Sequence, residues 1–502
     1  MRVRGKGGLA EVPEAVWTAR GQANALATFR RAARTVPAYR AFLKEHGIRP
    51  RDVRTYEDFE QLPTTSKENY LLRYDLAELM SGGGLGDTYI ITQSSGYSGQ
   101  PLFWPRFKRQ DDQPVKGMQA LYSLYDVFRK STLALNTFSL DTHVGGQCCT
   151  DFSLRVARGS RARLALATPG PSVEDTLELV THLSRRFEQT ILWGYPSLVH
   201  KIVVTGAEQG VQWSDLNTFV ICAGEGFSED WRRVMVGLLG CSPHPMRVGA
   251  LYGSADGSLM GFDTPVSIAT KQLAHDHKGL QSRVFRGQPP VAFVQFNPIG
   301  RFFESISGEL ALTCWQAVPM IRYVLHDIGD VLPFSTLMKH LECAGMQPDD
   351  TLADLGIQRE RVWQWPFLSC FGRSDGTVSI LGANVYPHAL QHVFAVHREA
   401  AHFKLAVDED AGGSGRLTVY VEWADGVPPP EVSRRLECVL HDEVLQALLA
   451  RNADYRTSFH EDPDACDPRI VVVAAGTGPF ASDAGRWKRA YTESAKQPGG
   501  NG

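Results

Sequence analysis

The sequence has 502 residues, of which 43% are hydrophobic and 21% charged, the balance of a folded soluble protein. A chain of this length exceeds one compact core, so we expect two or three domains. Lysine and arginine number 52 against 55 acidic residues, a formal net charge of −3, which gives no broad attraction to nucleic acid. We therefore expect a small-molecule partner and no nucleic-acid partner.

The sequence gives no signal for export or for a membrane. Arg2, Arg4 and Lys6 precede no apolar segment of the length that a signal peptide needs. No apolar run approaches the roughly 18 residues that span a bilayer. Nine cysteines are scattered along the chain, and their odd number favours reduced thiols. We expect a cytoplasmic protein without a membrane partner.

Apolar spacing predicts the first helices. The period of the apolar residues predicts helix over 16–47, with a break at Pro37, and over 115–128. Residues 68–80 are also expected to be helical, after a turn at 62–67.

The middle of the chain alternates strands with helices. Strands are predicted at 132–140, 164–168, 190–196, 218–222 and 247–252, and helices at 173–187 and from Ser228. Such alternation is typical of a mostly parallel sheet covered by helices. From 266 to 312 the pattern changes to short alternating segments, such as 291–296 and 308–312, which predicts a small antiparallel subdomain.

After Gly372 the pattern begins anew. Strands are predicted at 377–381, 404–407, 417–423 and 469–473, with one helix that Pro387 opens and another over 431–450. The expected fold class is therefore α/β: a large part with mostly parallel sheets, helices and a small antiparallel subdomain, followed by a small α+β part.

A stretch rich in serine and glycine follows the strand predicted near residues 88–92. Glycine lets consecutive backbone N–H groups face an anion, and serine adds hydroxyl donors. The stretch lacks the Gly-Lys-Ser/Thr ending of a Walker loop, and Pro101 and Pro105 oppose a following helix. An ordinary hairpin loop would have the same composition. The candidate phosphate-binding residues are Ser94, Ser95, Gly96, Ser98 and Gly99.

Four more segments follow in a fixed order: 223–225, 251–256, 321–327 and 372–375. Together with the serine-glycine loop they resemble the ordered motifs of the adenylate-forming ligases, most closely the phenylacetate-CoA ligase-like branch. The resemblance covers residues 25–490 and lies in the order of several weak motifs. It implies activation of a carboxylic acid with ATP and Mg²⁺ to an acyl-adenylate. The acyl group would then be transferred to a thiol, and coenzyme A is the thiol we expect.

The same resemblance implies a division of the chain. A large domain would span 1–371, a hinge 372–376 and a small mobile domain 377–502, with Asp375 and Gly376 as hinge residues. In that branch the connection at 331–370 commonly carries a cysteine-rich metal-binding turn. Here it holds only Cys343 and Cys370 and has helical spacing, so a zinc site is not favoured, and a lid or a homodimer contact is the open alternative.

Nucleotide-binding roles also come from the resemblance. Gly224 and Glu225 match the element at the adenine edge, although Ala223 replaces its first glycine. In the motif that begins Tyr252-Gly253, the tyrosine would lie against adenine.

The remaining polar matches concern the metal, the ribose and the phosphate. Asp256 would bind Mg²⁺, one methylene shorter than the usual glutamate. Asp327 would accept the ribose hydroxyls, with Asp330 as the alternative, and Arg373 would contact the nucleotide.

The C-terminal lysine of the family has two candidate positions. A gap-free register places Arg486 there, and a slide by two residues places Lys488 there. We favour Lys488 as the catalytic residue because an ammonium on a flexible stem suits a bridge between carboxylate and phosphate better than a planar guanidinium.

Aromatic residues near the expected acid pocket favour an aromatic carboxylic acid, although core aromatics would look the same. The candidates are Phe138, His143, Tyr195, Pro196 and Phe227. Two alternatives stay open: an adenylating enzyme that delivers the acyl group to an amine or a carrier protein, and a catalytically inactive nucleotide-binding protein.

Overall fold

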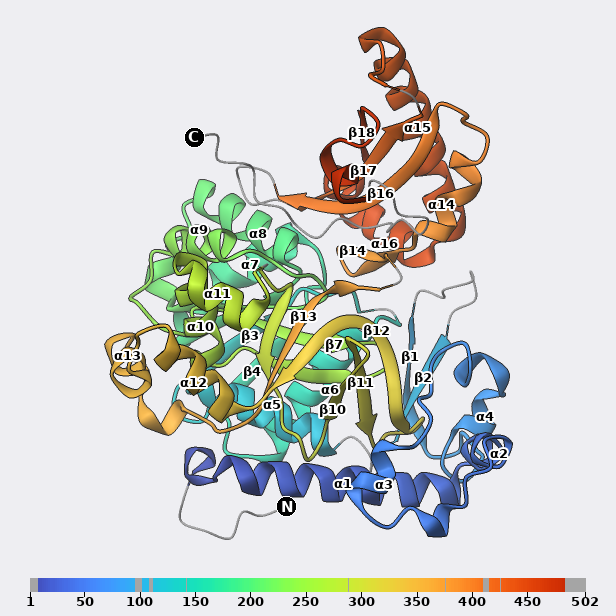
Figure 1. Ribbon diagram of the computed structural model, residues 1–502. Coiled ribbons are helices and arrows are strands. Elements are labelled where there is room, and N and C mark those ends of the chain that lie inside the picture. The colour runs from blue at the N-terminus through green and yellow to red at the C-terminus, as the bar shows by residue number, and fades with distance from the viewer. Residues whose placement is uncertain are drawn as a thin grey trace.

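One eleven-stranded sheet runs through the N-terminal part of the molecule (Figure 1). The computed structural model describes residues 8–94, 102–107, 112–140, 142–287, 289–374, 376–409, 415–424 and 426–483. The strand order is β10-β11-β12-β13-β9-β8-β7-β6-β5-β3-β4. Below, the N-terminal part means the described residues up to 374, and the C-terminal part those from 376 to 483.

Half of this sheet is parallel. Its strands are β3 (Thr132–Asn136), β4 (Leu164–Ala167), β5 (Gln189–Gly194), β6 (Thr218–Cys222) and β7 (Val248–Ser254). Every residue of β3, β5 and β6 is buried, because helices cover both faces of a parallel sheet. The predicted alternation is confirmed.

The other half is antiparallel and continues the same sheet. It comprises β8 (Ser258–Phe262), β9 (Ala292–Gln295), β10 (Phe302–Ile306), β11 (Glu309–Cys314), β12 (Met320–Leu332) and β13 (Phe367–Arg373). The α/β fold class is therefore confirmed, and its antiparallel strands extend the parallel sheet.

Helices of the sheet layer are α5 (Asp112–Leu124), α6 (Val144–Gly159), α7 (Val173–Leu183), α8 (Pro196–Glu208), α9 (Glu229–Leu239), α10 (Pro265–Asp276) and α11 (Lys278–Phe285). The sequence did not predict α6, because Gly145 and Gly146 indicated a loop. A Cβ on Gly146 would lie 2.1 Å from the carbonyl oxygen of Ser139. Glycine is needed there for close approach of two backbones and not for a turn.

Two sequence-based expectations were wrong. Residues 266–312 were expected to be strands throughout, yet α10 and α11 come first, and a capping box of Thr264 and Ser267 with Pro265 at the first turn starts α10. Residues 68–80 were expected to form one helix, but this segment contains only the 3-10 turn Leu71–Arg73 and the short helix Leu76–Leu79. Near its start, the Asn69 side chain accepts a hydrogen bond from the Ser66 backbone at 2.7 Å, and such local bonds compete with a helix.

The chain begins with a layer of helices at the opposite end from the C-terminal part (Figure 1). These are α1 (Glu14–Thr35), α2 (Pro37–Glu45), α3 (Tyr56–Glu60) and α4 (Leu76–Leu79). The break at Pro37 is confirmed. Short 3-10 turns lie at η1 (Leu9–Glu11), η2 (Pro50–Asp52), η3 (Leu71–Arg73), η4 (Ser184–Arg186), η5 (Trp213–Leu216), η6 (Arg359–Arg361) and η7 (Gly478–Asp483).

The connection at 331–370 holds α12 (Phe334–Cys343) and α13 (Pro348–Asp354). Leu337, Leu341 and Leu352 are buried in one cluster with Phe285 and Phe293, so these helices complete a core. Among the residues that the structure describes, no group of three His, Cys, Asp or Glu side chains could hold a metal ion.

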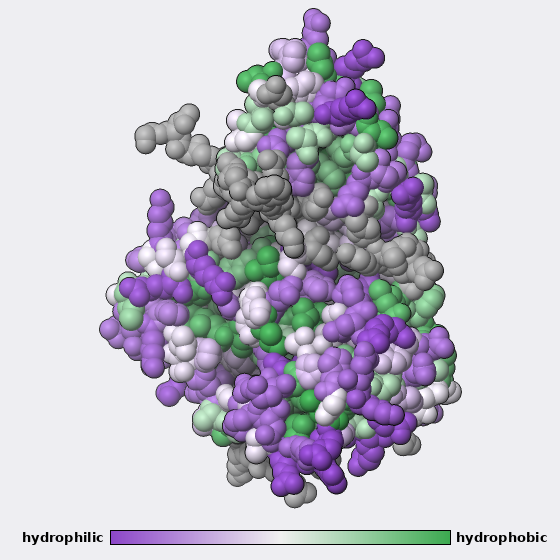
Figure 2. All heavy atoms as spheres, turned by 45° about the vertical axis from the view of Figure 1, so that its right-hand side comes forward, coloured by the Kyte–Doolittle hydropathy of each residue, from purple (hydrophilic) through white to green (hydrophobic). Residues whose placement is uncertain are grey.

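The C-terminal part forms two small sheets with helices. Its elements are β14 (Val378–Ile380), β15 (Ala383–Val385), α14 (Pro387–Phe394), β16 (Ala400–Glu409), β17 (Gly415–Trp423), α15 (Pro430–Arg451), α16 (Ala453–Glu461), α17 (Pro463–Cys466) and β18 (Arg469–Val473). The predicted α+β pattern is confirmed. On the face shown in Figure 2, hydrophilic residues cover most of the outer surface of both parts. No helix within the described ranges is long and apolar enough to cross a membrane.

Candidate active site

Three of the predicted nucleotide residues meet at the antiparallel half of the sheet. β12 and β13 pair with Asp327 opposite Arg373, and the Arg373 Nη1 lies 3.4 Å from the Asp327 Oδ1. The Tyr252 hydroxyl, on β7, donates a hydrogen bond to the Asp327 Oδ2. Asp327 is only 8% exposed. Tyr252 and Arg373, which are 75 and 46 positions away from Asp327 in the sequence, therefore both bind its carboxylate.

This contact fixes the protonation of the phenol. Burial, and then the neighbouring Asp327 carboxylate, raise the pKa of Tyr252 well above its ordinary value. Tyr252 therefore stays protonated and donates to Asp327, while the guanidinium of Arg373 balances the carboxylate charge.

Asp330, the alternative to Asp327, has other partners. It forms an ion pair with Arg286, and its Oδ1 accepts a weak hydrogen bond from the Ser305 hydroxyl at 3.4 Å. Asp327 and not Asp330 therefore lies beside Tyr252 and Arg373.

His326 links the Asp327 strand to the predicted hinge, a link that no sequence motif indicated. Its ring nitrogens lie 3.3 Å from the Glu68 carboxylate and 3.4 Å from that of Glu309. The Ser374 hydroxyl donates to Glu309, and the Ser374 N–H donates to the His326 carbonyl at 2.8 Å. The hydrogen bond to Glu68 is the largest of the effects that raise the pKa of His326.

The turn that carries Asp256 connects β7 and β8 and is held by buried polar groups. The Gln316 amide donates to the Asp256 carbonyl at 2.5 Å. Two buried arginines, Arg106 and Arg301, donate to backbone carbonyls at Ala255 and Gly257, at 3.5 and 3.1 Å. The sequence did not single out either arginine, because nothing local distinguishes a buried arginine from an exposed one.

Asp256 offers one carboxylate to a metal. Burial, and then the Asp256 carboxylate, raise the pKa of Tyr323 well above its ordinary value, and the Tyr323 side chain hydrogen-bonds to that carboxylate. Mg²⁺ commonly takes one or two carboxylates together with water and substrate phosphates. The residues present are therefore compatible with Mg²⁺ bound mainly through a nucleotide.

The predicted phosphate loop connects two paired strands. β1 (Thr88–Ser94) and β2 (Leu102–Phe107) form a separate antiparallel sheet. Ser94 is the last residue of β1, and Ser95, Gly96, Ser98 and Gly99 lie outside the described residues. The Gln93 N–H donates to the Thr142 carbonyl at 2.9 Å, which places the base of this loop beside the segment that enters α6.

The candidate acid pocket lies where three parallel strands end. Phe138, Tyr195 and Gly224 follow β3, β5 and β6, which are neighbours in the sheet, and this edge of a parallel sheet is where ligands bind. The Phe138 and Tyr195 ring centroids are 5.0 Å apart and nearly perpendicular. A Cβ on Gly224 would lie 2.8 Å from the Tyr195 ring, and Gly224 has a φ of +86°, so only glycine fits beside this ring.

Residues of the C-terminal part close over the same ring. Gly382, in the turn between β14 and β15, would place a Cβ 2.3 Å from the Tyr195 hydroxyl. Its N–H donates to the Glu225 Oε1 at 3.3 Å. Burial raises the pKa of Glu225 to about 8, against the lowering effect of the Gly382 and Leu381 backbones.

The other three candidates for the acid pocket are His143, Pro196 and Phe227, and they lie near the starts of separate helices. His143 precedes α6, with its Nε2 4.0 Å from the Asp454 Oδ1, and Pro196 opens α8. Phe227 packs against Trp231, with ring centroids 4.6 Å apart, and lies under the Arg232 guanidinium. These contacts of Phe227 are not with Phe138 or Tyr195, so its place in the pocket stays a prediction.

The hinge residues are described only in part. Gly372 and Gly376 have φ angles of +125° and +74°, conformations that glycine adopts without strain. Asp375, Arg486 and Lys488 lie outside the described residues. Their roles stay predictions.

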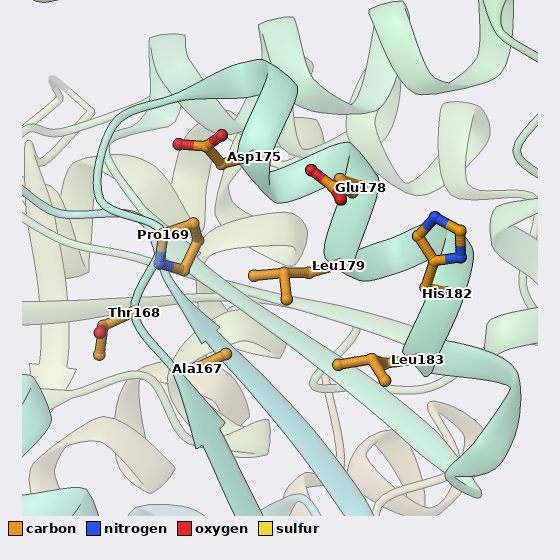
Figure 3. A pocket seen from close by; sticks show the side chains of 8 residues that line it. All are labelled: Ala167, Thr168, Pro169, Asp175, Glu178, Leu179, His182 and Leu183. Carbon is orange, nitrogen blue, oxygen red and sulfur yellow. The ribbon is translucent and has the colours of Figure 1, made fainter.

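A hollow of about 530 Å³ lies at the carboxyl end of the edge strand β4, between that strand end and α7 (Figure 3). It is lined by Ala167, Thr168, Pro169, Asp175, Glu178, Leu179, His182 and Leu183. None of the residues singled out by the sequence lines it, so the candidate site stays at the strand ends described above.

Comparisons with known proteins fix the fold. Neither a protein-family model nor a curated protein sequence matches this chain. Among solved structures, 2-hydroxyisobutyryl-CoA ligase with 2-HIB-AMP and CoA in the thioesterification state matches with a TM-score of 0.60 and 15% identity, over 96% of this chain and 90% of that chain.

Two other states of that enzyme also match. Its postadenylation state has a TM-score of 0.54 at 14% identity, over 97% and 91% of the two chains. An open conformation has a TM-score of 0.52 at 14% identity, over 96% and 92%. The chain therefore has the overall fold of 2-hydroxyisobutyryl-CoA ligase.

Proposed function

We propose that this protein is an AMP-forming ligase that activates a carboxylic acid with ATP and passes the acyl group to the thiol of coenzyme A. The observation that carries the proposal is the meeting of Tyr252, Asp327 and Arg373, on a fold shared with a CoA ligase. These residues belong to three of the ordered motifs that the sequence resembles.

The polar groups of this cluster suit a nucleotide. The Asp327 carboxylate has two oxygens with about four acceptor positions, of which Tyr252 and Arg373 use one on each oxygen. A carboxylate is also the natural group to accept hydrogen bonds from ribose hydroxyls. When bound, ATP supplies the α-phosphate that an acid attacks and the pyrophosphate that leaves. The Arg373 guanidinium then stabilises negative charge near the phosphates.

Roles in metal and phosphate binding are proposed from the positions of Asp256 and of the loop after Ser94 in the sequence motifs. Asp256 would hold Mg²⁺, and the loop after Ser94 would hold the phosphates with backbone N–H groups and hydroxyls. Buried Arg106 and Arg301 fix the Asp256 turn, so its carboxylate needs little reorganisation on binding.

The aromatic pair favours an aromatic acid. Phe138 and Tyr195 form a rigid edge-to-face wall at the strand ends, which fits the phenylacetate-CoA ligase-like branch. The matching enzyme is named for a small hydroxy acid, and the likeness to it concerns the fold. Both kinds of acid therefore belong in the test.

We also propose the division into a large domain at 1–371, a hinge at 372–376 and a small mobile domain at 377–502. Gly382 of the small domain touches Tyr195 and Glu225 beside the acid pocket. We interpret this as the arrangement for acyl transfer. The higher TM-score against the thioesterification state than against the postadenylation and open states supports it.

The test is acid-dependent exchange of pyrophosphate into ATP, across a panel of aryl, arylalkyl and small hydroxy acids. Exchange with any acid establishes adenylation, and the acceptor is then found by supplying coenzyme A, an amine or a phosphopantetheinylated carrier protein. ATP binding without exchange for every acid would favour the inactive nucleotide-binding protein.

A further inference from the structure

Polar residues around the end of α16 face the N-terminal part. The Ser139 hydroxyl donates to the Glu461 Oε1 at 2.6 Å. The Lys201 ammonium lies 2.9 Å from the Asp462 Oδ2. These two contacts join residues 322 and 261 positions apart, on opposite sides of the proposed hinge. We refer to Ser139, Lys201, Glu461 and Asp462 as the α16 latch.

The latch lies beside the candidate acid pocket. Ser139 follows the pocket residue Phe138, and Lys201 is on α8, the helix that begins next to Tyr195. In the C-terminal part, the Ser458 hydroxyl of α16 donates to the Leu381 carbonyl at 3.0 Å. This bond ties α16 to the turn that contains Gly382, so the latch and the turn move together.

Burial makes the latch specific for this arrangement. Ser139 is 3% exposed and Asp462 6% exposed. Asp462 also accepts a hydrogen bond from the Ala465 N–H, and the Lys201 side chain is 46% exposed. Removing Lys201 therefore leaves a buried carboxylate with one charged partner fewer. When the C-terminal part swings away, water can solvate all four side chains. Loss of one partner therefore penalises the closed arrangement more than any open one.

We propose that the α16 latch positions the small domain for acyl transfer, by holding Gly382 against Tyr195 and Glu225. The inference deepens the proposed function and rests on it. Latch residues are positioning residues: the contacts that define the latch are with one another and not with Tyr252, Asp327 or Arg373. Adenylation requires another arrangement of the small domain, in which these contacts are broken. Weakening the latch shifts the population away from the transfer arrangement only.

The variants for the test are Lys201→Met, which keeps the apolar stem, and Glu461→Gln, which removes the charge and keeps the shape. We expect pyrophosphate exchange at the wild-type rate, and single-turnover transfer from a preformed adenylate to coenzyme A about tenfold slower, from the loss of one charged partner. Lys201→Arg should restore transfer. The matched control is Lys44→Met, at an exposed position on α2.

A second readout does not depend on activity. Cys343 on α12 and Cys438 on α15 are the two exposed cysteines among those described, one in each part of the chain. Fluorescence energy transfer between labels on them reports the arrangement of the two parts. We expect Lys201→Met to broaden the distribution toward open arrangements relative to wild type and Lys44→Met.

The two failures can be told apart. If transfer and energy transfer are both unchanged in Lys201→Met and Glu461→Gln, the latch is wrong even when exchange occurs. If no acid supports exchange, the proposed function fails, and the energy-transfer distributions still decide whether the latch holds the two parts together. An equal loss of exchange and transfer in Lys201→Met would also overturn the latch.

Discussion

The backbone N–H of Gly382 donates to the carboxylate of Glu225 across 3.3 Å, and this bond joins residues 157 positions apart. A titratable group therefore lies at the contact between the two parts of the chain. Burial raises its pKa to about 8 from an ordinary value of 4.5. The closed arrangement consequently holds a proton on Glu225 at pH values where an open arrangement releases it.

The first prediction concerns pH. A carboxyl group whose pKa is raised in the closed arrangement stabilises that arrangement fully when the pH is below its ordinary pKa. This stabilisation is lost as the pH rises through the raised pKa. We therefore expect the closed fraction, measured by energy transfer between Cys343 and Cys438, to fall as the pH rises from about 4.5 to about 8. Glu225→Gln, which stays neutral, should remove most of this dependence. An unchanged pH profile in Glu225→Gln would assign the effect to another group.

The second prediction separates two neighbouring aspartates. Asp327→Ala should weaken ATP and AMP binding by roughly 1.5–3 kcal/mol, because a charged hydrogen-bond partner is lost. Asp330→Ala should leave binding unchanged, since Asp330 pairs with Arg286. Isothermal titration calorimetry measures both. The opposite ranking would move the ribose site to Asp330.

The third prediction concerns a close approach. Gly382→Ala adds a Cβ that would lie 2.3 Å from the Tyr195 hydroxyl, at a φ of +77°. The closed arrangement should become inaccessible, so transfer to coenzyme A should fall by at least about tenfold while exchange persists. Gly476→Ala is the control for backbone strain, because it has a φ of +67° and nothing within 4 Å of its added Cβ. Similar losses in both variants would show a folding defect.

The fourth prediction decides the register of the C-terminal lysine. Lys488→Ala should abolish pyrophosphate exchange and still convert a supplied acyl-adenylate with coenzyme A. If Arg486→Ala abolishes exchange and Lys488→Ala does not, arginine has replaced the lysine. Wild-type exchange in both variants would contradict the closing-domain mechanism.

The fifth prediction concerns the hinge. Asp375→Pro fixes φ near −65° and should restrict rotation about the hinge. We expect this variant to retain much of the exchange and to lose most product formation with coenzyme A, as measured in the same two assays. Equal retention of both steps would place the rotation at another residue.

The sequence predicted the elements whose signals are local. The buried parallel strands were readable because a run of apolar residues fixes burial on both faces of a strand. The strand at Arg469–Val473 was readable because its residues after Arg469 are β-branched. The break at Pro37 was readable because proline cannot continue a helix interior. Helix α6 was not predicted, since Gly146 serves a contact with the Ser139 backbone that lies outside its own segment.

The same division applies to the candidate site. The sequence alone singled out Tyr252, Asp327 and Arg373, because the order of the motifs carries that information. Only the tertiary structure decided that Asp327 and not Asp330 meets the other two, since this depends on the register of β12 against β13.

The sequence could not predict the contacts between the N-terminal and C-terminal parts. Nothing local marks Glu461 or Lys201, because exposed and interfacial charges have the same sequence pattern. Pairing of Lys201 with Asp462 depends on where the hinge places the C-terminal part. The sequence thus determined which residues are candidates for binding a nucleotide. The packing of distant segments decided which of these candidates lie together, because contact energies fall off within a few ångströms in space and do not follow distance along the chain.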